Sequence, residues 1–405
     1  MYSSNLIPVK NALQIIRNVK ITLNKEKICL EEANTRVLAE DIEVLIAVPP
    51  FDRSAMDGYA VIAEDTSDAS PSNPIYLEVI DEIGAGSVSE HTLSQGKAIK
   101  IATGAPMPAR SNAVIMEEDT EQMGNKIKIT KRVAFNRDVA LKGEDLKKGE
   151  IILKEGQILG PHHLSVIASS GYNKVKVFKK PKVGVIITGN ELVEPAAHLE
   201  PGKIPNSNKF ALKGVVEESL AVPYVKHCRD DFDTMINELQ DYIEKVDVVI
   251  TTGGTAISKG DVVVSATSKL GKVLVHGVTI KPGKPVGFGV INNKPVFMLS
   301  GYPVAAAVQF DIFARNYILK MQNIHKEFDL IKCTAGDDIK SSKGKCNVIR
   351  SKLVGDVVYP IKTKAGINKS IVMSNCYIIV DEDTKDIKKG EECSIIKYSS
   401  FKVFE

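Results

Sequence analysis

Residues 182–192, KVGVIITGNEL, decide the fold class of this chain. The apolar run Val183–Thr188 is typical of a strand, and a glycine turn follows it directly. The order of strand, glycine turn and helix recurs between residues 180 and 325, which favours a parallel sheet with helices on both faces. Strands are expected at Val183–Thr188, Val222–Cys228, Asp247–Thr252 and Val286–Val290, and helices near 208–220, 232–245 and 303–320.

The chain before this segment shows two different sequence patterns. Val9, Leu13 and Ile16 recur at helical spacing, and a second helix is expected around Val37 and Leu38. From residue 47 to 140, short β-rich runs alternate with Gly, Pro, Ser and Asn, a pattern typical of a small β domain.

A further helix is predicted before Gly171, because Pro161 stands in its first turn and glycine follows its end. His162 and His163 are neighbours in this helix and point about 100° apart, so we interpret them as surface residues rather than a metal pair.

Short strands return after residue 326. The expected domains are 1–46 together with 141–178, then 47–140, 179–325 and 326–405.

Composition excludes several classes of function. The 405 residues are 43% apolar and 25% charged, as in soluble proteins of several domains. A net charge of +3 is too small to predict a nucleic-acid or membrane partner. The chain has no signal-like start and no apolar run of about 18 residues, so we expect a cytoplasmic protein. Its six cysteines lack the spacing of zinc or disulfide sites, which indicates reduced thiols.

Three loops of the α/β segment are expected at the carboxyl ends of strands, where such sheets bind ligands. Their glycines let backbone N–H groups approach an anion, their threonines add donors, and Lys281 and Lys284 add positive charge. Each loop alone is as well explained as a structural turn, and none is a P-loop. Together they predict a phosphate site formed by Thr188–Glu191, Thr251–Thr255 and Lys281–Pro285.

Three acids are expected near the same edge: Glu191, Asp230 and Asp261. Carboxylates beside phosphates are what a partly hydrated Mg²⁺ needs. The alternative for each is a helix N-cap or a first-turn acid, and for Asp230 this alternative is slightly favoured.

Two loops of the β domain combine small, turn-forming residues with polar side chains. Phe51–Ala60 contains Asp57, and Ala102–Pro108 contains Thr103. Such loops either bind a ligand or make a tight connection, and composition does not decide between the two.

Six motifs in order resemble those of the molybdopterin molybdenumtransferases, the family of MoeA and the gephyrin E domain. They span nearly the whole chain, and the ordered set is far more specific than any one motif. The resemblance implies a central doubly wound α/β domain of the MogA type, smaller β-rich domains, and an elongated N-terminal region of helices and strands. The motifs are Ser54–Ala60, Thr103–Pro106, Gly143–Asp145, Thr188–Leu192, Gly253–Gly254 with Asp261, and Lys281–Pro285.

The family implies a reaction in which adenylated molybdopterin and molybdate give the molybdenum cofactor and AMP, with Mg²⁺. It also implies a homodimer in which Asp57 and Thr103 of one subunit complete the site of the other. The catalytic set would be Asp57, Thr103, Glu191, Asp230, Asp261 and Lys281, with Glu191 and Asp261 on the cation. Substrate would be bound by Gly253, Gly254, Thr255, Lys284, Gly301 and Pro303. A molybdopterin adenylyltransferase is the protein partner that such a pathway suggests.

This chain departs from the family pattern at three places. Leu299-Ser300-Gly301-Tyr302-Pro303 stands where the family has Leu-Pro-Gly-Asn-Pro. Gly277, beside His276, stands where many members have a lysine, which leaves His276 as a further anion contact. Near the C-terminus, Lys364–Ser370 aligns only loosely with a stretch of Gly and Ser, and Arg350 is matched to a basic residue of the preceding strand.

Two other interpretations stay open. The α/β domain resembles that of the separate adenylyltransferase, which would adenylate molybdopterin, although the Ser54–Ala60 motif favours the later, metal-inserting step. A non-catalytic dimeric scaffold is the other, although a scaffold has no physical need for facing carboxylates and lysines. Molybdate and tungstate are not distinguished, because both are tetrahedral dianions of similar size.

Overall fold

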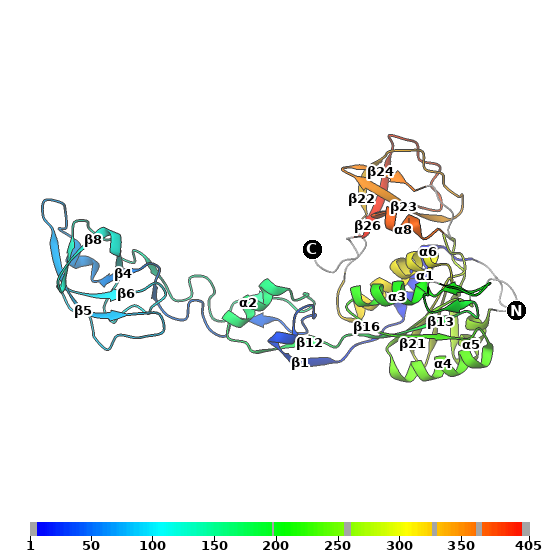
Figure 1. Cartoon of the computed structure of the whole chain (residues 1–405), viewed down its shortest axis with the longest axis horizontal. Coiled ribbons are helices and arrows are strands. Elements are labelled where there is room, and N and C mark those ends of the chain that lie inside the picture. Colours follow the sequence, from blue (N-terminus) through cyan, green and yellow to red (C-terminus); the bar gives the residue numbers. More distant parts are fainter. Residues whose placement is uncertain (1–5, 197, 255–260, 326–329, 362–366, 399–405) are drawn as a thin grey trace.

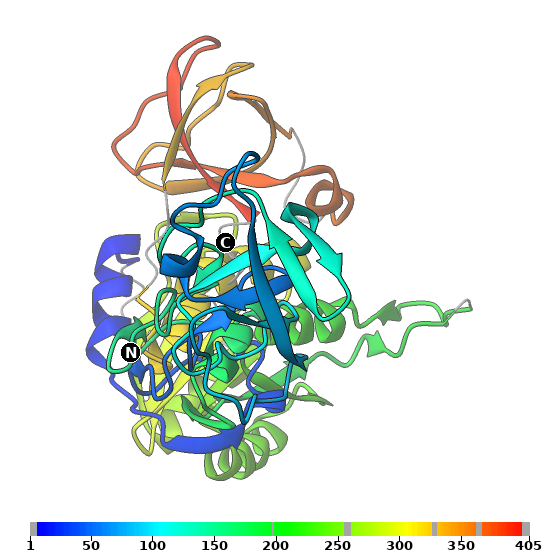
Figure 2. The ribbon, with the colours of Figure 1, turned by 90° about the vertical axis from the view of Figure 1, so that its left-hand side faces the viewer.

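The computed structural model describes residues 6–196, 198–254, 261–325, 330–361 and 367–398. The molecule is elongated (Figure 1). A β domain lies at one end, a small region with β1, β12 and α2 lies in the middle, and an α/β unit with the C-terminal β domain beside it lies at the other end. Viewed along the long axis, the β domain lies in front of the α/β unit (Figure 2). Among the described residues, no helix has the length and apolar character needed to cross a membrane.

The α/β unit is built on a six-stranded sheet of order β16-β13-β17-β21-β20-β18. The first four strands are parallel, β20 runs antiparallel to β21, and β18 pairs antiparallel with β20. The bounds are β13 Lys182–Thr188, β16 Val222–Cys228, β17 Val248–Thr252, β18 Lys272–His276, β20 Gly287–Ile291 and β21 Lys294–Leu299.

The sheet is parallel, as expected, except at the edge formed by β20 and β18. The strand expected at Val286–Val290 is β20, and β21 folds back beside it as a hairpin. Asn292 and Asn293 form the turn with φ of 48° and 62°. Asparagine tolerates this left-handed backbone, which matches the twist of a two-residue hairpin. The Asn292–Asn293 pair was the signal in the sequence for β21, and neither β21 nor β18 was expected.

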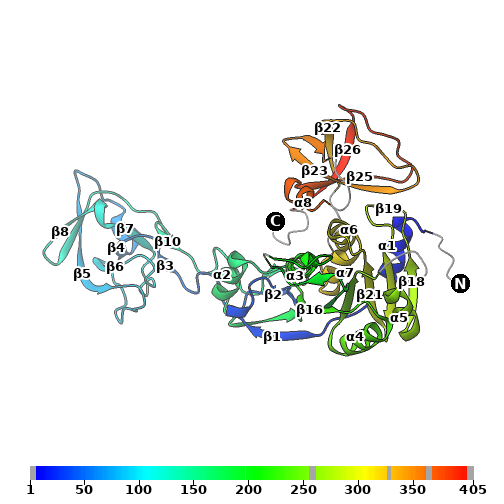
Figure 3. The same cartoon turned by 45° about the vertical axis from the view of Figure 1, so that its right-hand side comes forward.

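Helices cover both faces of the sheet, as expected for a doubly wound fold (Figure 3). Buried residues of α1, α3, α6 and α7 form one core with the sheet, and those of α4 and α5 form a second. The helix expected at 303–320 is one continuous helical run with a π-helical middle, η4. The bounds are α1 Val9–Asn18, α3 Ser207–Glu218, α4 Phe232–Lys245, α5 Val262–Leu270, α6 Pro303–Gln309, η4 Phe310–Arg315 and α7 Asn316–Met321.

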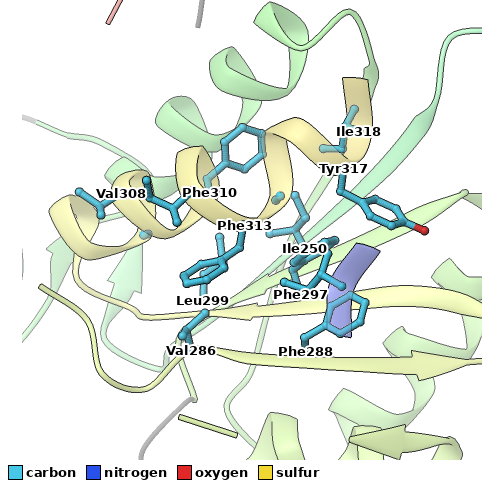
Figure 4. Close-up of a cluster of buried hydrophobic side chains, with 14 of the residues drawn as sticks. Ile250, Val286, Phe288, Phe297, Leu299, Val308, Phe310, Phe313, Tyr317 and Ile318 are labelled. Atoms are coloured by element: carbon cyan, nitrogen blue, oxygen red, sulfur yellow. The ribbon is translucent and has the colours of Figure 1, made fainter. Parts of the chain in front are cut away.

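Aromatic side chains fill the core between the sheet and this helical run (Figure 4). The rings of Phe288 and Phe297 lie 4.9 Å apart between centroids, and Phe297 meets Tyr317 edge-on at 5.7 Å. All three side chains are buried, so they anchor α7 to the centre of the sheet. This core fixes the strands whose ends carry the polar loops.

The N-terminal region differs from the expectation in two ways. Helix α1 packs through Ala12 and Ile16 into the core of the α/β unit, not against residues 141–178. The helix expected around Val37 and Leu38 is wrong: a 3₁₀ turn at Leu30–Glu32 precedes them, and both are fully buried in isolated bridges to strand-like neighbours. The remaining elements are β1 Lys25–Cys29 paired with β12 Lys174–Phe178, β2 Ile42–Glu43 paired with β11 Ile151–Leu153, and α2 Pro161–Ser169.

The two other β domains each hold a six-stranded sheet. The first has the strand order β7-β4-β6-β5-β9-β8. A separate pair of strands, β3 Arg53–Ser54 and β10 Val139–Ala140, belongs to the same domain. The bounds of the six strands are β4 Gly58–Val61, β5 Ile75–Ile83, β6 Lys97–Ile101, β7 Ala113–Met116, β8 Thr120–Met123 and β9 Lys126–Ile129. The second comprises β22 Ile331–Ala335, β23 Cys346–Val354, β24 Val357–Pro360, β25 Cys376–Val380 and β26 Glu392–Lys397, with α8 at Lys369–Met373. Its edge strand β19, Ile280–Lys281, comes from the α/β unit and so ties the two together.

Candidate functional site

A cavity of about 710 Å³ opens at the carboxyl ends of β13, β17 and β21. We call it the sheet-edge cavity. It brings together predicted site residues from all three loops and from the helix start at Pro303. Those predicted residues are Glu191, Asp230, Gly253, Gly254, Lys284, Gly301 and Pro303, and the further lining used below is Thr188, Leu192, Ile204, Pro205, Asn208, Thr252, Ser300 and Tyr302.

The Gly253–Gly254 turn needs glycine at both positions. Gly253 has a φ of +89°, and a Cβ there would lie 2.1 Å from the carbonyl oxygen of Thr188. Gly254 has a φ of +60°, and its Cβ would lie 2.9 Å from Oδ1 of Asp230. The turn can therefore approach a ligand with its bare backbone, as anion-binding turns do. Thr255, predicted to join it, lies outside the described residues.

Two carboxylates line the sheet-edge cavity, those of Glu191 and Asp230. Asp230 Oδ1 accepts a hydrogen bond from the hydroxyl of Thr188 at 3.1 Å. The N-cap alternative for Asp230 is wrong, because the neighbouring Asp231 caps α4 by accepting from the N–H of Thr234 at 2.9 Å. Asp230 is thus left to face the cavity beside the glycine turn.

Asp261 has a different position from the one expected. It is 6% exposed and caps α5, since its Oδ1 accepts from the N–H of Val264 at 2.8 Å. Its Oδ2 lies 3.7 Å from Nε2 of His276, whose pKa is lowered by burial. Asp261 is not among the residues that line the sheet-edge cavity. The N-cap alternative describes what its side chain does here, and its role toward a cation stays a prediction.

The two lysines of the Lys281–Pro285 turn serve different cavities. Lys284 lines the sheet-edge cavity, whereas Lys281 lines a second one of about 470 Å³ between the α/β unit and the C-terminal domain. We call the second the interdomain cavity. Lys281 Nζ donates to the hydroxyl of Ser342 at 2.8 Å. Both lysines lie near Lys345: the charge of Lys284, then burial, then hydrogen bonding with Lys284 and last the charge of Lys281 lower the pKa of Lys345.

Arg350 also lines the interdomain cavity and is 7% exposed. Its Nη1 donates to the hydroxyl of Ser370 at 2.6 Å, and its Nε has no hydrogen-bond partner among the described residues. Burial lowers its pKa. The cavity's carboxylate, Asp338, already accepts from the N–H of Lys389 at 3.0 Å. The interdomain cavity is therefore a cationic pocket suited to an oxyanion.

Asp57 and Thr103 meet in the β domain at the far end of the molecule (Figure 1). Asp57 Oδ1 accepts from the backbone N–H of Thr103 at 2.7 Å and from its hydroxyl at 2.9 Å. These two hydrogen bonds, the backbone one first, lower the pKa of Asp57. Within one chain this exposed pair does not reach the sheet-edge cavity, so a site shared with a second chain stays a prediction.

Of the cavity residues that were not predicted to belong to the site, Asn208 and Tyr302 matter most for its geometry. Asn208 is buried at the start of α3, and its Nδ2 donates to the carbonyl of Gly301 at 2.9 Å. Tyr302 lines the sheet-edge cavity with its side chain mostly in solvent. The unusual Ser-Gly-Tyr-Pro order was the available signal for Tyr302, whereas nothing local marked Asn208.

The described residues contain no group of three or more His, Cys, Asp or Glu side chains arranged to hold a metal ion. Of the six cysteines, all described as free thiols, Cys29 is exposed and the others are buried. Burial raises the pKa of Cys346 to about 12, which keeps that thiol protonated. Among the described residues, the sheet-edge cavity offers a cation the carboxylates of Glu191 and Asp230.

Comparison with known proteins covers the whole length of the chain. Residues 7–171 match the MoeA N-terminal region (domains I and II), residues 184–320 match a probable molybdopterin-binding domain, and residues 332–398 match the MoeA C-terminal region (domain IV). A putative molybdopterin biosynthesis protein of Methanocaldococcus jannaschii is 38% identical, over 96% of this chain and 97% of that protein.

Two further relatives agree. The molybdopterin molybdenumtransferase of Staphylococcus aureus is 35% identical, over 97% of this chain and 96% of that protein. A crystal structure of the molybdopterin biosynthesis MoeA protein from Pyrococcus horikoshii is 38% identical and has a TM-score of 0.82, covering 97% of this chain and 100% of that one. Sequence, fold and all three regional matches agree, and the chain therefore belongs to the MoeA family, the molybdopterin molybdenumtransferases.

Proposed function

We propose that this protein inserts molybdenum into adenylated molybdopterin and releases AMP. The observation that carries the proposal is the meeting of Glu191, Asp230, the Gly253–Gly254 turn and Lys284 in one cavity of a MoeA-family chain. Carboxylates, bare backbone and a lysine are the groups that a phosphoanhydride and its counter-ion require. The pterin phosphate and the AMP phosphate would lie along the glycine turn.

The chemistry asked of these side chains is electrostatic. Hydrolysis of the phosphoanhydride bond between molybdopterin and AMP adds water across that bond, and it leaves one phosphate on the pterin and the other on the departing AMP, both negatively charged. Lys284 would stabilise this negative charge with its own positive charge, and the N–H groups of the Gly253–Gly254 turn would stabilise it by donating hydrogen bonds. The dithiolene of the pterin supplies the sulfur ligands for the inserted metal, so no protein cysteine is needed.

Mg²⁺ fits the two carboxylates of the sheet-edge cavity. Glu191 and Asp230 would hold it together with phosphate oxygens and water, because Mg²⁺ usually takes only one or two protein carboxylates. The ion would offset the charge on the phosphates. The pair expected from the sequence was Glu191 with Asp261. For Asp261 to bind the same ion, its carboxylate would have to do so while it accepts the hydrogen bond from Val264 at the start of α5, or give up that hydrogen bond.

The oxyanion, molybdate or tungstate, would bind in the interdomain cavity. Lys281 and the buried guanidinium of Arg350 line this cavity, and Lys345 lies close by. An oxyanion would provide the buried Arg350 Nε with an acceptor. Because Lys281 and Lys284 belong to one turn, the oxyanion would be held next to the pterin substrate.

A homodimer would complete the sheet-edge cavity. Asp57 and Thr103 are joined to each other, exposed, and distant from the cavity of their own chain. In the proposed dimer they reach the cavity of the other subunit, where Asp57, kept ionised by Thr103, adds a third carboxylate.

The test is incubation of the purified protein with adenylated molybdopterin, Mg²⁺ and either molybdate or tungstate, with AMP and metal-loaded pterin measured. Oxyanion-dependent AMP release with metal in the pterin is expected. Absence of both products would reject the proposal and favour a scaffold. Consumption of ATP with unmodified molybdopterin would instead identify an adenylyltransferase.

A further inference from the structure

Tyr302 carries an unexplained aromatic surface into the sheet-edge cavity. Among the described residues that line this cavity, Tyr302 is the only aromatic one, and 67% of its surface is exposed. Single exposed apolar residues are common on protein surfaces and need no explanation by themselves. A tyrosine at the edge of a cavity that also contains the Gly253–Gly254 turn is a different case.

The backbone that carries Tyr302 is held on both sides. The N–H of Ser300 donates to Oε1 of Gln309 at 2.7 Å, and the hydroxyl of Thr252 donates to the carbonyl of Ser300 at 2.8 Å. Asn208 holds the carbonyl of Gly301, and Pro303 begins α6. These hydrogen bonds hold the backbone of the loop in place, although none of them requires an aromatic side chain at position 302.

The position of the ring relates it to the anion turn. A Cβ added at Gly301 would lie 3.3 Å from the Cα of Gly253, so the loop that carries Tyr302 touches the Gly253–Gly254 turn. The cavity also has an apolar wall, formed by Leu192, Ile204 and Pro205. These residues belong to the green arm that projects from the α/β unit (Figure 2). A ligand whose phosphate lies at the turn would place its next group between ring and wall.

The geometry points to Tyr302 as the residue that recognises the planar heteroaromatic ring of the substrate, by stacking against it. This inference rests on the proposed function, in which the substrate carries a purine and a pterin, each close to a phosphate. Both are flat, nitrogen-rich rings of the kind that stack on tyrosine. The side chain then selects for the ring, while the glycine turn and Lys284 bind the phosphate.

The experiment measures binding of paired probes by calorimetry, with Mg²⁺ and without turnover. AMP is compared with ribose 5-phosphate, which has the same sugar phosphate but no base. A pterin with a phosphorylated side chain is compared with glycerol phosphate. We expect Tyr302→Leu to weaken the binding of at least one ring-bearing probe about tenfold and to leave its ringless counterpart unchanged. The pair that responds identifies purine or pterin as the stacked ring.

Two variants serve as controls. Tyr302→Phe keeps the ring and should bind within about twofold of the unaltered protein. Tyr224→Leu changes a tyrosine of β16 that is also exposed but does not line the cavity, and should have no effect. The inference is overturned if Tyr302→Leu binds both ring-bearing probes normally, if it weakens ringless probes equally, or if neither ring-bearing probe binds the unaltered protein. Ring-selective loss without any AMP-releasing activity would reject the proposed function and keep this inference.

Discussion

The sheet-edge cavity and the interdomain cavity share one turn, Lys281–Pro285, but differ in what surrounds its two lysines. Lys284 lines a cavity that also contains two carboxylates and the Gly253–Gly254 turn, whereas Lys281 lines the cavity that contains the buried Arg350. Mixed charge suits a phosphorylated substrate that arrives with a cation. Nearly unopposed positive charge suits a free oxyanion. In the proposed function, this one short turn would hold two anions apart and yet next to each other.

The largest expected effect comes from removing a carboxylate that lines only the sheet-edge cavity. Glu191→Gln removes one of the two carboxylates of the sheet-edge cavity, so Mg²⁺-dependent AMP release should fall by about 100-fold. Tungstate binding, assigned to the other cavity, should not change. Glu194→Gln is the matched control, because Glu194 lies on the same arm but pairs with Lys209 at 2.6 Å. Equal loss in both variants would contradict the assignment.

The next effect tests whether the sheet-edge cavity is completed by a second chain while the interdomain cavity is not. Asp57→Ala and Glu191→Gln are each expected to be nearly inactive. After subunit exchange of a one-to-one mixture, half the dimers would be mixed and each would hold one intact site, which restores about one quarter of the activity. No recovery despite demonstrated exchange would place Asp57 outside the site.

A smaller effect concerns the interdomain cavity. Arg350→Met removes its buried charge, so the dissociation constant for tungstate should rise about tenfold. The midpoint of thermal unfolding should be unchanged or higher, because a buried cation without a carboxylate partner does not stabilise the fold. Lys352→Met changes an exposed lysine of the same strand and should leave both the dissociation constant for tungstate and the midpoint of unfolding unchanged. Unaltered tungstate binding in Arg350→Met would end the assignment of this cavity to the oxyanion.

The smallest effect is local to the β domain. Thr103→Val removes the hydroxyl that donates to Asp57 but keeps the backbone N–H that donates more strongly to the same carboxylate. The lowered pKa of Asp57 should therefore rise part of the way toward its ordinary value, as measured by NMR titration. Because a lowered carboxylate pKa favours the ionised form, the charge of Asp57 would then be lost at a higher pH on acidification. An unchanged pKa would show that the hydroxyl contributes nothing.

Local patterns were sufficient for much of the α/β unit. β16 and α4 have the bounds that were expected, because apolar runs and capping residues act within a few positions along the chain. The two carboxylates Glu191 and Asp230 also reach one cavity from different loops, as parallel strands bring their ends to one edge. The hairpin of β20 and β21 was missed because an Asn-Asn turn, not a helix, joins those strands.

The sequence by itself determined the family, the doubly wound unit and the residue types of the proposed phosphate site, since each depends on order along the chain. Only the tertiary structure decided that Asp261 caps α5, that Lys281 and Lys284 enter different cavities, and that Arg350 is buried beside Lys281. The physical reason is that a side chain's partners are set by packing between distant segments. Spacing places a residue near a site, but burial and hydrogen bonding decide which way it faces.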